Sequence, residues 1–157
     1  MPSPRVDKDI RLLMDKLYHI REPHIKAFLL FGSRARGEAQ DRSDVDLLIL
    51  HDGCGIDDPV ARRRYLYGLV REAIGSRFDG LAVLDMELRQ FLEPKEVNAL
   101  LLNIYWDALV LLDNTGTLRP FLESVRKAIA KSGLKREREG RAFHWVLPEP
   151  LKEVKLL

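Results

Sequence analysis

The sequence is short of cysteine, of long apolar runs and of net charge, and each shortage excludes a class of protein. Its one cysteine, Cys54, excludes an internal disulfide, and the four histidines show no metal-binding spacing, so a Cys/His metal cluster is excluded too. No apolar run approaches the roughly 20 residues of a membrane helix, and the opening MPSPRVDKDI lacks the apolar core of a signal peptide. We therefore expect a cytoplasmic protein. A formal net charge of +2 is too small to indicate nucleic-acid binding by itself.

The remaining composition is that of a globular protein with a charged surface. The 157 residues are 46% hydrophobic and 32% charged, which is enough apolar material to bury a core. Apolar periodicity and glycine or proline stops predict helices at 10–20, 59–74, 93–105 and 117–133, and strands at 25–31, 44–50, 78–84 and 108–112. This alternation predicts an α/β (α+β) fold, in which helices pack against a mixed β-sheet.

The C-terminal tail, residues 131–157, combines basic and aromatic residues. Its sequence LKREREGRAFHWVL predicts a small hairpin that turns at Glu139-Gly140. The basic residues, with Phe143 and Trp145 close behind them, would suit binding of a nucleic-acid strand. Glutamates at 137 and 139 dilute that charge, so we favour a hairpin that packs its aromatic residues on the domain.

Two aspartates open the second predicted strand, and they are the first candidates for chemistry. Alternate strand residues point to the same face, so Asp44 and Asp46 should project together. Neighbouring carboxylates favour raised pKa values or a bound cation, and Mg²⁺ takes one or two carboxylates and completes its shell with substrate phosphates. The preceding strand ends in Gly32-Ser33, a turn whose backbone N–H groups and hydroxyl could hold those phosphates. Together these residues suit phosphoryl or nucleotidyl transfer.

Strand direction selects a third carboxylate. The helix at 59–74 is a crossover that would make the second and third strands parallel, so their starting ends should meet at one edge of the sheet. Asp79, at the start of the third strand, should then lie near Asp44 and Asp46, whereas Asp85 should lie about 20 Å away at the other end. The first strand runs antiparallel to the second, which brings Gly32-Ser33 to the same edge as Asp79.

The stretch FGSRARGEAQDRSDVDLLIL resembles the signature of the polymerase-β-type nucleotidyltransferase superfamily, and most closely its minimal nucleotidyltransferase (MNT) branch. The family pattern is an apolar residue, Gly-Ser, a variable stretch with Arg-Gly, and Ser-Asp-x-Asp-Leu. The positions that match it are Phe31, Gly32, Ser33, Arg36, Gly37, Ser43, Asp44, Asp46 and Leu47. The segments FDGLAVLDMEL and NIYWDALVLLD resemble the family's third and closing strands, and Gly80 stands where the family has an apolar residue.

The resemblance implies Mg²⁺-dependent transfer of a nucleoside monophosphate from a nucleoside triphosphate to a hydroxyl acceptor. We expect AMP to be transferred from ATP, and another nucleoside triphosphate is the alternative substrate. The resemblance further implies that Asp44 and Asp46 hold two metal ions, and that Asp79 holds the metal at the acceptor and takes its proton. Gly32 and Ser33 would bind the β- and γ-phosphates, and Arg36 would steer the triphosphate. We expect this nucleotidyltransferase domain to span residues 1–114, followed by an extension at 115–157 of unknown role.

The resemblance also implies a partner. Small relatives are paired with an all-helical HEPN-type toxin, and as antitoxins they adenylylate one of its tyrosines. Two alternatives stay open: a non-catalytic antitoxin that acts by occlusion, and a transferase acting on nucleic acid through the basic tail. Aromatic residues in the fourth strand region and the tail are compatible with a homodimer.

Overall fold

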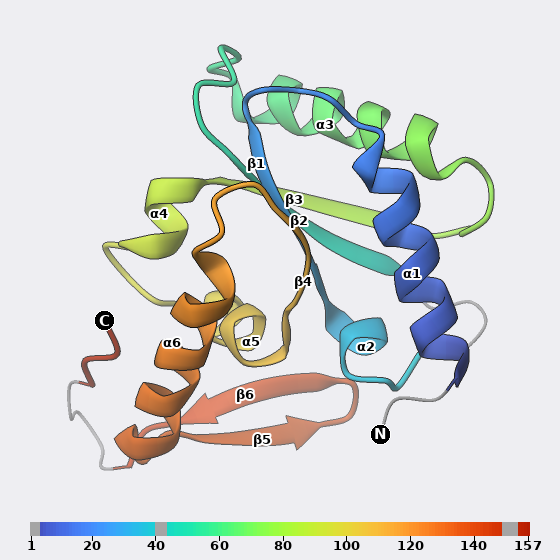
Figure 1. Cartoon of the computed structure of the whole chain (residues 1–157). Coiled ribbons are helices and arrows are strands. Elements are labelled where there is room, and N and C mark those ends of the chain that lie inside the picture. The colour runs from blue at the N-terminus through green and yellow to red at the C-terminus, as the bar shows by residue number, and fades with distance from the viewer. Residues whose placement is uncertain (1–3, 40–43, 149–153) are drawn as a thin grey trace.

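A computed structural model of the chain describes residues 4–39, 44–148 and 154–157, and one four-stranded sheet lies at its centre (Figure 1). The elements, in order, are α1 (Pro4–Tyr18), β1 (Ile25–Phe31), α2 (Gly32–Ala35), β2 (Val45–His51), α3 (Pro59–Ile74), β3 (Leu81–Glu87), α4 (Leu88–Leu92), α5 (Ala99–Asp107), β4 (Leu109–Asp113), α6 (Leu118–Ser132), β5 (Lys135–Glu139) and β6 (Ala142–Val146). The sheet order is β3-β2-β1-β4, with β2 and β3 parallel and the other pairs antiparallel. This arrangement confirms the predicted α/β (α+β) fold with a mixed sheet.

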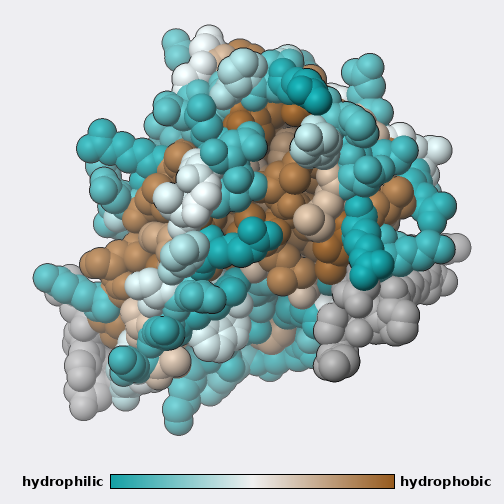
Figure 2. Space-filling view, in the orientation of Figure 1, coloured by the Kyte–Doolittle hydropathy of each residue, from teal (hydrophilic) through white to brown (hydrophobic). Residues whose placement is uncertain are grey.

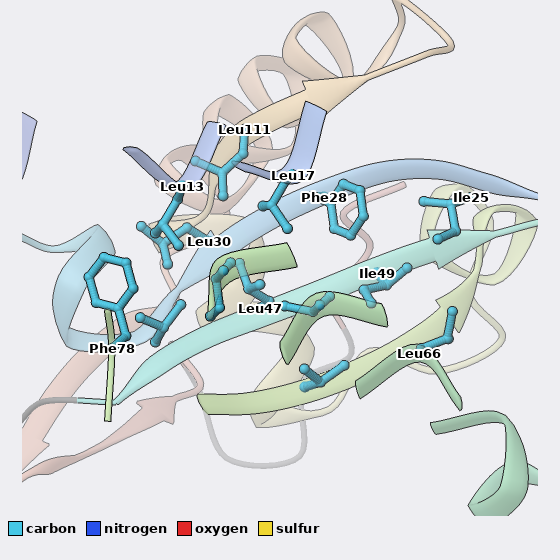
Figure 3. Packing of buried hydrophobic residues seen from close by; sticks show 14 residues of the cluster. Leu13, Leu17, Ile25, Phe28, Leu30, Leu47, Ile49, Leu66, Phe78 and Leu111 are labelled. Atoms are coloured by element: carbon cyan, nitrogen blue, oxygen red, sulfur yellow. The ribbon is translucent and has the colours of Figure 1, made fainter. Parts of the chain in front are cut away.

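The two faces of the sheet bury separate hydrophobic clusters because alternate strand residues point to opposite sides. On β2, Val45, Leu47 and Ile49 enter a cluster covered by α1 and α3. Figure 3 shows this cluster from close by, with side chains from the helices directed at those of β1 and β2. Leu48 and Leu50 of the same strand enter the second cluster, under α5 and α6. By the same alternation, Asp46 lies on the α5 and α6 side of the sheet.

Helix α6 packs into the second cluster although it belongs to the predicted C-terminal extension. Leu118, Leu122, Val125 and Ile129 recur at helical spacing and are all buried. Its first turn is capped by Asp113, whose carboxylate accepts a hydrogen bond from the Leu118 amide at 3.0 Å, and the Thr117 side chain makes no capping hydrogen bond. The boundary after residue 114 stays a prediction, but in packing terms residues 118–132 share the core of the domain.

Three predicted elements differ by two residues or more from their observed bounds. The first, the helix predicted at 10–20, spans Pro4–Tyr18. The third strand begins at Leu81 and not at residue 78, because Phe78 is buried from a turn and the extended chain starts only after Gly80. The helix predicted at 93–105 begins at Ala99, where the Asn98 side chain accepts a hydrogen bond from the Leu101 amide at 2.8 Å. Pro94 lies in the loop that joins this helix to the short α4.

The tail forms the predicted hairpin. Strands β5 and β6 pair antiparallel, and Gly140 at their turn has φ +62°, a conformation that favours glycine.

Figure 2 shows one face of the molecule, in the orientation of Figure 1. Hydrophobic side chains gather in the middle of that face, and hydrophilic ones surround them. Within the described ranges, none of the helices has the length and apolarity needed to cross a membrane.

Candidate active site

The site begins where β1 ends and turns directly into α2. Gly32 is the first residue of α2 and has φ +76°. A Cβ on this residue would overlap the Asp46 Oδ2 atom and stand 3.0 Å from its Cγ. Phe31 is paired with Asp46 in the β1–β2 register, which explains the close approach. Glycine is therefore required at residue 32 for two reasons, its backbone conformation and the room that the Asp46 carboxylate occupies.

Asp44 has the same relationship with a second glycine. A Cβ on Gly80 would overlap the Asp44 Oδ1 atom and stand 2.8 Å from its Cγ. The Val45 amide donates a hydrogen bond to the Gly80 carbonyl at 2.9 Å, so the start of β2 is fixed against the start of β3. The apolar residue expected at position 80 in the family would displace the Asp44 side chain here. Two glycines thus make room for two carboxylates at one edge of the sheet.

Electrostatics at this edge favours a cation. Burial raises the pKa of Asp46, and the negative charge of Asp44 raises it further. The positive charges of Arg36 and Arg34 oppose this shift. The pKa of Asp46 nevertheless stays above its ordinary value, so the two carboxylates are incompletely neutralised by the chain. Carboxylate oxygens held together in this way are ligands that suit Mg²⁺.

Asp79 lies at the predicted edge but is not brought into a group with the other two aspartates. Its side chain is exposed, and its carbonyl accepts a hydrogen bond at 3.5 Å from Arg71 of α3, the helix on the other side of the sheet. The β3 residue paired with Asp46 is Ala82, which carries no ligand atom in its side chain. Across residues 8–39, 44–148 and 154–157, no three His, Cys, Asp or Glu side chains are placed to share a metal ion.

Ser33 follows Gly32 in the first turn of α2, where backbone N–H groups have no partner inside the helix. Residues 32–38, which we call the Gly-Ser loop, close on themselves: the amides of Arg36, Gly37 and Glu38 donate to the carbonyls of Gly32, Arg34 and Ser33, respectively. This placement beside Asp46 suits the phosphate role expected for Gly32 and Ser33, which stays a prediction. Ser43, the other serine of the signature, lies outside the described residues.

The two loop arginines point to different sides. Arg34 is buried, donates to Asp9 of α1 at 3.0 Å and lies 5.1 Å from the centre of the Phe78 ring. Arg36 donates through Nη1 to Asp107 at 3.3 Å and through Nε to Glu38 at 3.2 Å. Its guanidinium also lies 4.8 Å from the centre of the Phe143 ring in β6. Sequence reasoning missed Asp107 and Phe143 as partners of the site, because neither is near Arg36 in the chain.

Asp85 belongs to a separate charged cluster at the other end of β3, as the strand directions predicted. It is paired with Ile49, and its side chain is only 1% exposed. Its carboxylate accepts hydrogen bonds from Arg62 Nε at 2.7 Å, Arg63 Nε at 3.0 Å and His51 Nε2 at 3.0 Å. Arg62 and the half-exposed Arg63, both in α3, therefore hold this buried carboxylate.

The residues present fit one hard cation between Asp44 and Asp46. Their carboxylates lie at one edge, burial and then their mutual repulsion raise the pKa of Asp46, and the Gly-Ser loop beside them offers backbone donors for phosphate. A second ion would need a ligand besides these two, and Asp79 is not placed beside them. The arrangement can therefore bind one Mg²⁺ together with the phosphates of a nucleotide.

Comparisons with known proteins identify a family model and several solved structures to which the chain is similar. Residues 15–97 match the family model described as "Polymerase beta, Nucleotidyltransferase". A search of curated proteins found no match. A protein from Sulfolobus solfataricus proposed to be a nucleotidyltransferase is 20% identical, with a TM-score of 0.47 over 69% of this chain and 83% of that chain.

Two toxin–antitoxin structures are also similar. One, a complex with AMP-PNP, is 21% identical with a TM-score of 0.44, and the other, a mutant of the MntA–HpeT pair, is 20% identical with a TM-score of 0.43. Each similarity covers 75% of this chain and 81% of that chain. The match to the family model spans more than half of the chain and includes the Gly-Ser loop, Asp44, Asp46 and Asp79. The chain belongs to the polymerase beta nucleotidyltransferase family.

Proposed function

We propose that this protein transfers a nucleoside monophosphate, AMP from ATP, to a hydroxyl group of an acceptor, with Mg²⁺ bound by Asp44 and Asp46. The observation that carries this proposal is the seating of the two carboxylates against Gly32 and Gly80 beside the first turn of α2. When bound there, Mg²⁺ would neutralise charge on the triphosphate and polarise its phosphorus–oxygen bonds.

The residues of the chain have distinct tasks in this reaction. The backbone N–H groups of Gly32 and Ser33, with the Ser33 hydroxyl, hold the β- and γ-phosphates, and Arg36 adds positive charge beside them. The acceptor oxygen forms a bond to the α-phosphorus. The bond from that phosphorus to the oxygen of the β-phosphate breaks, and pyrophosphate leaves with the electron pair. Positioning and charge neutralisation account for most of such catalysis.

Asp79 is proposed as the group that receives the acceptor proton, and a second Mg²⁺ is proposed to bind with it. Its position two residues before β3 supports this role, because it is next to Gly80, which lies against the Asp44 carboxylate. The exposed side chain must then turn toward Asp44 when substrate binds. Replacement of Asp79 by Asn should consequently lower the rate of transfer more than the affinity for nucleotide.

The acceptor that the sequence resemblance favours is a tyrosine of a HEPN-type toxin, which would make the protein an antitoxin. Two other functions stay open: neutralisation of the toxin by occlusion alone, and transfer to nucleic acid. Against the nucleic-acid function, Phe143 and Trp145 are both used in packing against the domain, Phe143 under Arg36 and Trp145 against Trp106. Those rings are therefore not presented as a stacking surface for bases.

The experiment that tests this proposal supplies α-labelled ATP and Mg²⁺ to the wild type and to the Asp44→Asn/Asp46→Asn double variant, with the neighbouring gene's product as acceptor. Label on a tyrosine of the acceptor, with the wild type only, is the expected result. Neutralisation of the acceptor by both proteins without any labelling would favour occlusion. RNA binding that falls steeply with salt, with label on the RNA, would favour the nucleic-acid function.

A further inference from the structure

The C-terminal hairpin presents one face to the Gly-Ser loop. In the β5–β6 register, Arg136 is paired with Trp145 and Arg138 with Phe143. Directly paired residues project to the same side of a ribbon, so these four side chains share a face. Residues 135, 137 and 139 of β5 alternate with the arginines and project to the opposite face. Figure 1 shows the hairpin below α5 and α2, and β6 packs against α5.

Phe143 is the centre of that face. The guanidinium carbons of Arg136, Arg138 and Arg36 lie 4.1, 4.7 and 4.8 Å from the centre of its ring. Arg136 and Arg138 come from the hairpin itself, but Arg36 comes from the Gly-Ser loop. Cations are attracted to the face of an aromatic ring, so one ring joins the loop to the hairpin.

Shared carboxylates reinforce the same contact. Asp107, at the end of α5, accepts hydrogen bonds from Arg36 Nη1 at 3.3 Å and Arg136 Nη1 at 2.7 Å, and its side chain is only 6% exposed. Glu38 accepts from Arg36 Nε and from Arg138 Nη2. Each carboxylate therefore bonds one arginine of the loop and one of the hairpin, which makes the orientation of Arg36 depend on the hairpin.

The hairpin is itself fixed to α5 at a second place. Trp145 donates through Nε1 to the side-chain oxygen of Asn103 at 2.9 Å, and its ring meets Trp106 edge to face at 6.1 Å between centres. On the same face of the hairpin, Trp145 thus fixes it to α5 and Phe143 contacts the Gly-Ser loop. The Arg36 amide, in turn, donates a hydrogen bond at 3.2 Å to the carbonyl of Gly32, the residue that lies against the Asp46 carboxylate.

We propose that the β5–β6 hairpin is part of the nucleotide site, as a positioning element that fixes the Gly-Ser loop through Arg36. Phe143 is its positioning residue: it touches no substrate and acts through the Arg36 guanidinium. This assigns a task to the end of the chain, and it rests on the proposed function because Arg36 is taken there to bind the triphosphate. The hairpin then fixes the loop before nucleotide arrives, which lowers the entropy lost on binding.

The first test compares nucleotide affinity among Phe143→Ala, Phe143→Tyr and the control His144→Ala, whose side chain lies on the other face of the same strand. We expect Phe143→Ala to weaken Mg·ATP binding about tenfold, as loss of a ring contact with a cation would. Phe143→Tyr should restore affinity, and His144→Ala should leave it unchanged. In an Arg36→Ala background, Phe143→Ala should have no further effect, since coupled residues are not additive. Equal affinity in wild type and Phe143→Ala would overturn the proposal.

The second test needs no nucleotide and separates this proposal from the proposed function. The amides of Arg36, Gly37 and Glu38 are hydrogen bonded within the loop, so their exchange with solvent reports how well the loop is fixed. Phe143→Ala should speed their exchange relative to His144→Ala while leaving the amides of β1 and β2 protected. Unchanged exchange would overturn the positioning role, even if the wild type binds ATP. Faster exchange in Phe143→Ala, together with a wild type that binds no ATP, would support the positioning role and reject the proposed function.

Discussion

Gly80 lies against the carboxylate of Asp44 so closely that any side chain at position 80 would meet it. Replacement of Gly80 by Ala should displace Asp44 and weaken Mg·ATP binding by at least about tenfold, a loss of roughly 1.4 kcal/mol. Its backbone needs no left-handed conformation, so the effect should come from the clash alone. Calorimetric titration of the variant with Mg·ATP measures it.

Gly68 provides the control for that variant. It lies inside α3, and a Cβ there would meet nothing within 4 Å. Gly68→Ala should leave nucleotide affinity unchanged and should stabilise the fold by roughly 0.5–1 kcal/mol, because alanine is the better helix former. A loss of affinity in both variants would mean that Gly80 has no special relationship with Asp44.

Gly32 and Gly37 form a second matched pair, since both have a left-handed backbone, with φ +76° and +74°. Only Gly32 would bring a Cβ against a side chain, that of Asp46, whereas Gly37 has nothing within 4 Å. Each change to Ala should cost roughly 1–2 kcal/mol in backbone strain, read from urea unfolding. Gly32→Ala alone should also abolish nucleotide binding. Binding by Gly32→Ala that equals binding by Gly37→Ala would contradict the assigned role of the Asp46 carboxylate.

Asp46 should destabilise the protein in the absence of metal. Burial and the charge of Asp44 raise its pKa, so the folded state binds this proton more tightly than the unfolded state does. Its contribution to the free energy of unfolding therefore falls as the pH rises from the ordinary aspartate range through the folded-state pKa. Asp46→Asn should raise Tm at neutral pH by roughly 2–4 °C, equivalent to about 1 kcal/mol.

The same variant should lose the stabilisation that Mg·ATP gives to the wild type. Thermal unfolding with and without Mg·ATP measures both effects on one sample, since a ligand bound only by the folded state raises Tm. Asp52→Asn, a change at an exposed carboxyl in the loop after β2, serves as the control. A variant at position 46 that is less stable than the wild type without metal would contradict this account of the site.

Asp85 has the opposite electrostatic situation. Burial would raise its pKa, but hydrogen bonds from Arg62, Arg63 and His51 outweigh that effect and lower it. Its contribution to stability is therefore complete above the ordinary aspartate pKa and is lost as the pH falls through the lowered folded-state value. Asp85→Ala should cost roughly 1–3 kcal/mol at neutral pH, because it leaves the partly buried Arg62 and the buried His51 without their hydrogen-bond acceptor.

Unfolding by urea at pH 7 and at pH 3 checks that expectation. The difference in stability between wild type and Asp85→Ala should be smaller at pH 3, because the unfolded chain already binds a proton at Asp85 there, below the ordinary aspartate pKa. Nucleotide binding at pH 7 by the folded fraction should be unchanged, because Asp85 lies at the other end of β3. A difference that grows on acidification would contradict the direction of the pKa shift.

Much of the domain follows from local patterns in the sequence. Strand Ile25–Phe31 and helix Pro59–Ile74 were predicted with their observed bounds. The strand is a short apolar run that ends at Gly32, and the helix has apolar residues at helical spacing between Pro59 and Gly75. The parallel pairing of β2 and β3 followed from the crossover helix. Strand β3 was misplaced by three residues, since Phe78 is apolar and buried as a strand residue would be but lies in a turn.

The site could be predicted only in part. Asp44 and Asp46 are two residues apart on one strand, so alternation alone brings them together. The contacts that hold Arg36 could not be predicted, because Asp107 and Phe143 are distant in sequence and reach it only through tertiary packing. Glu38, which accepts a hydrogen bond from Arg36, also accepts one from Arg138, a residue 100 positions away in the sequence. No periodic pattern carries that information.

The most direct test of the central claim is calorimetric titration of ATP into the wild type and into the Asp44→Asn/Asp46→Asn variant, each with Mg²⁺ and with EDTA. The account predicts binding by the wild type that requires Mg²⁺, and loss of that binding in a variant that remains folded. Binding of ATP by both proteins with equal affinity, or by neither, would contradict the assignment of Asp44 and Asp46 as the carboxylates that hold the metal and the nucleotide.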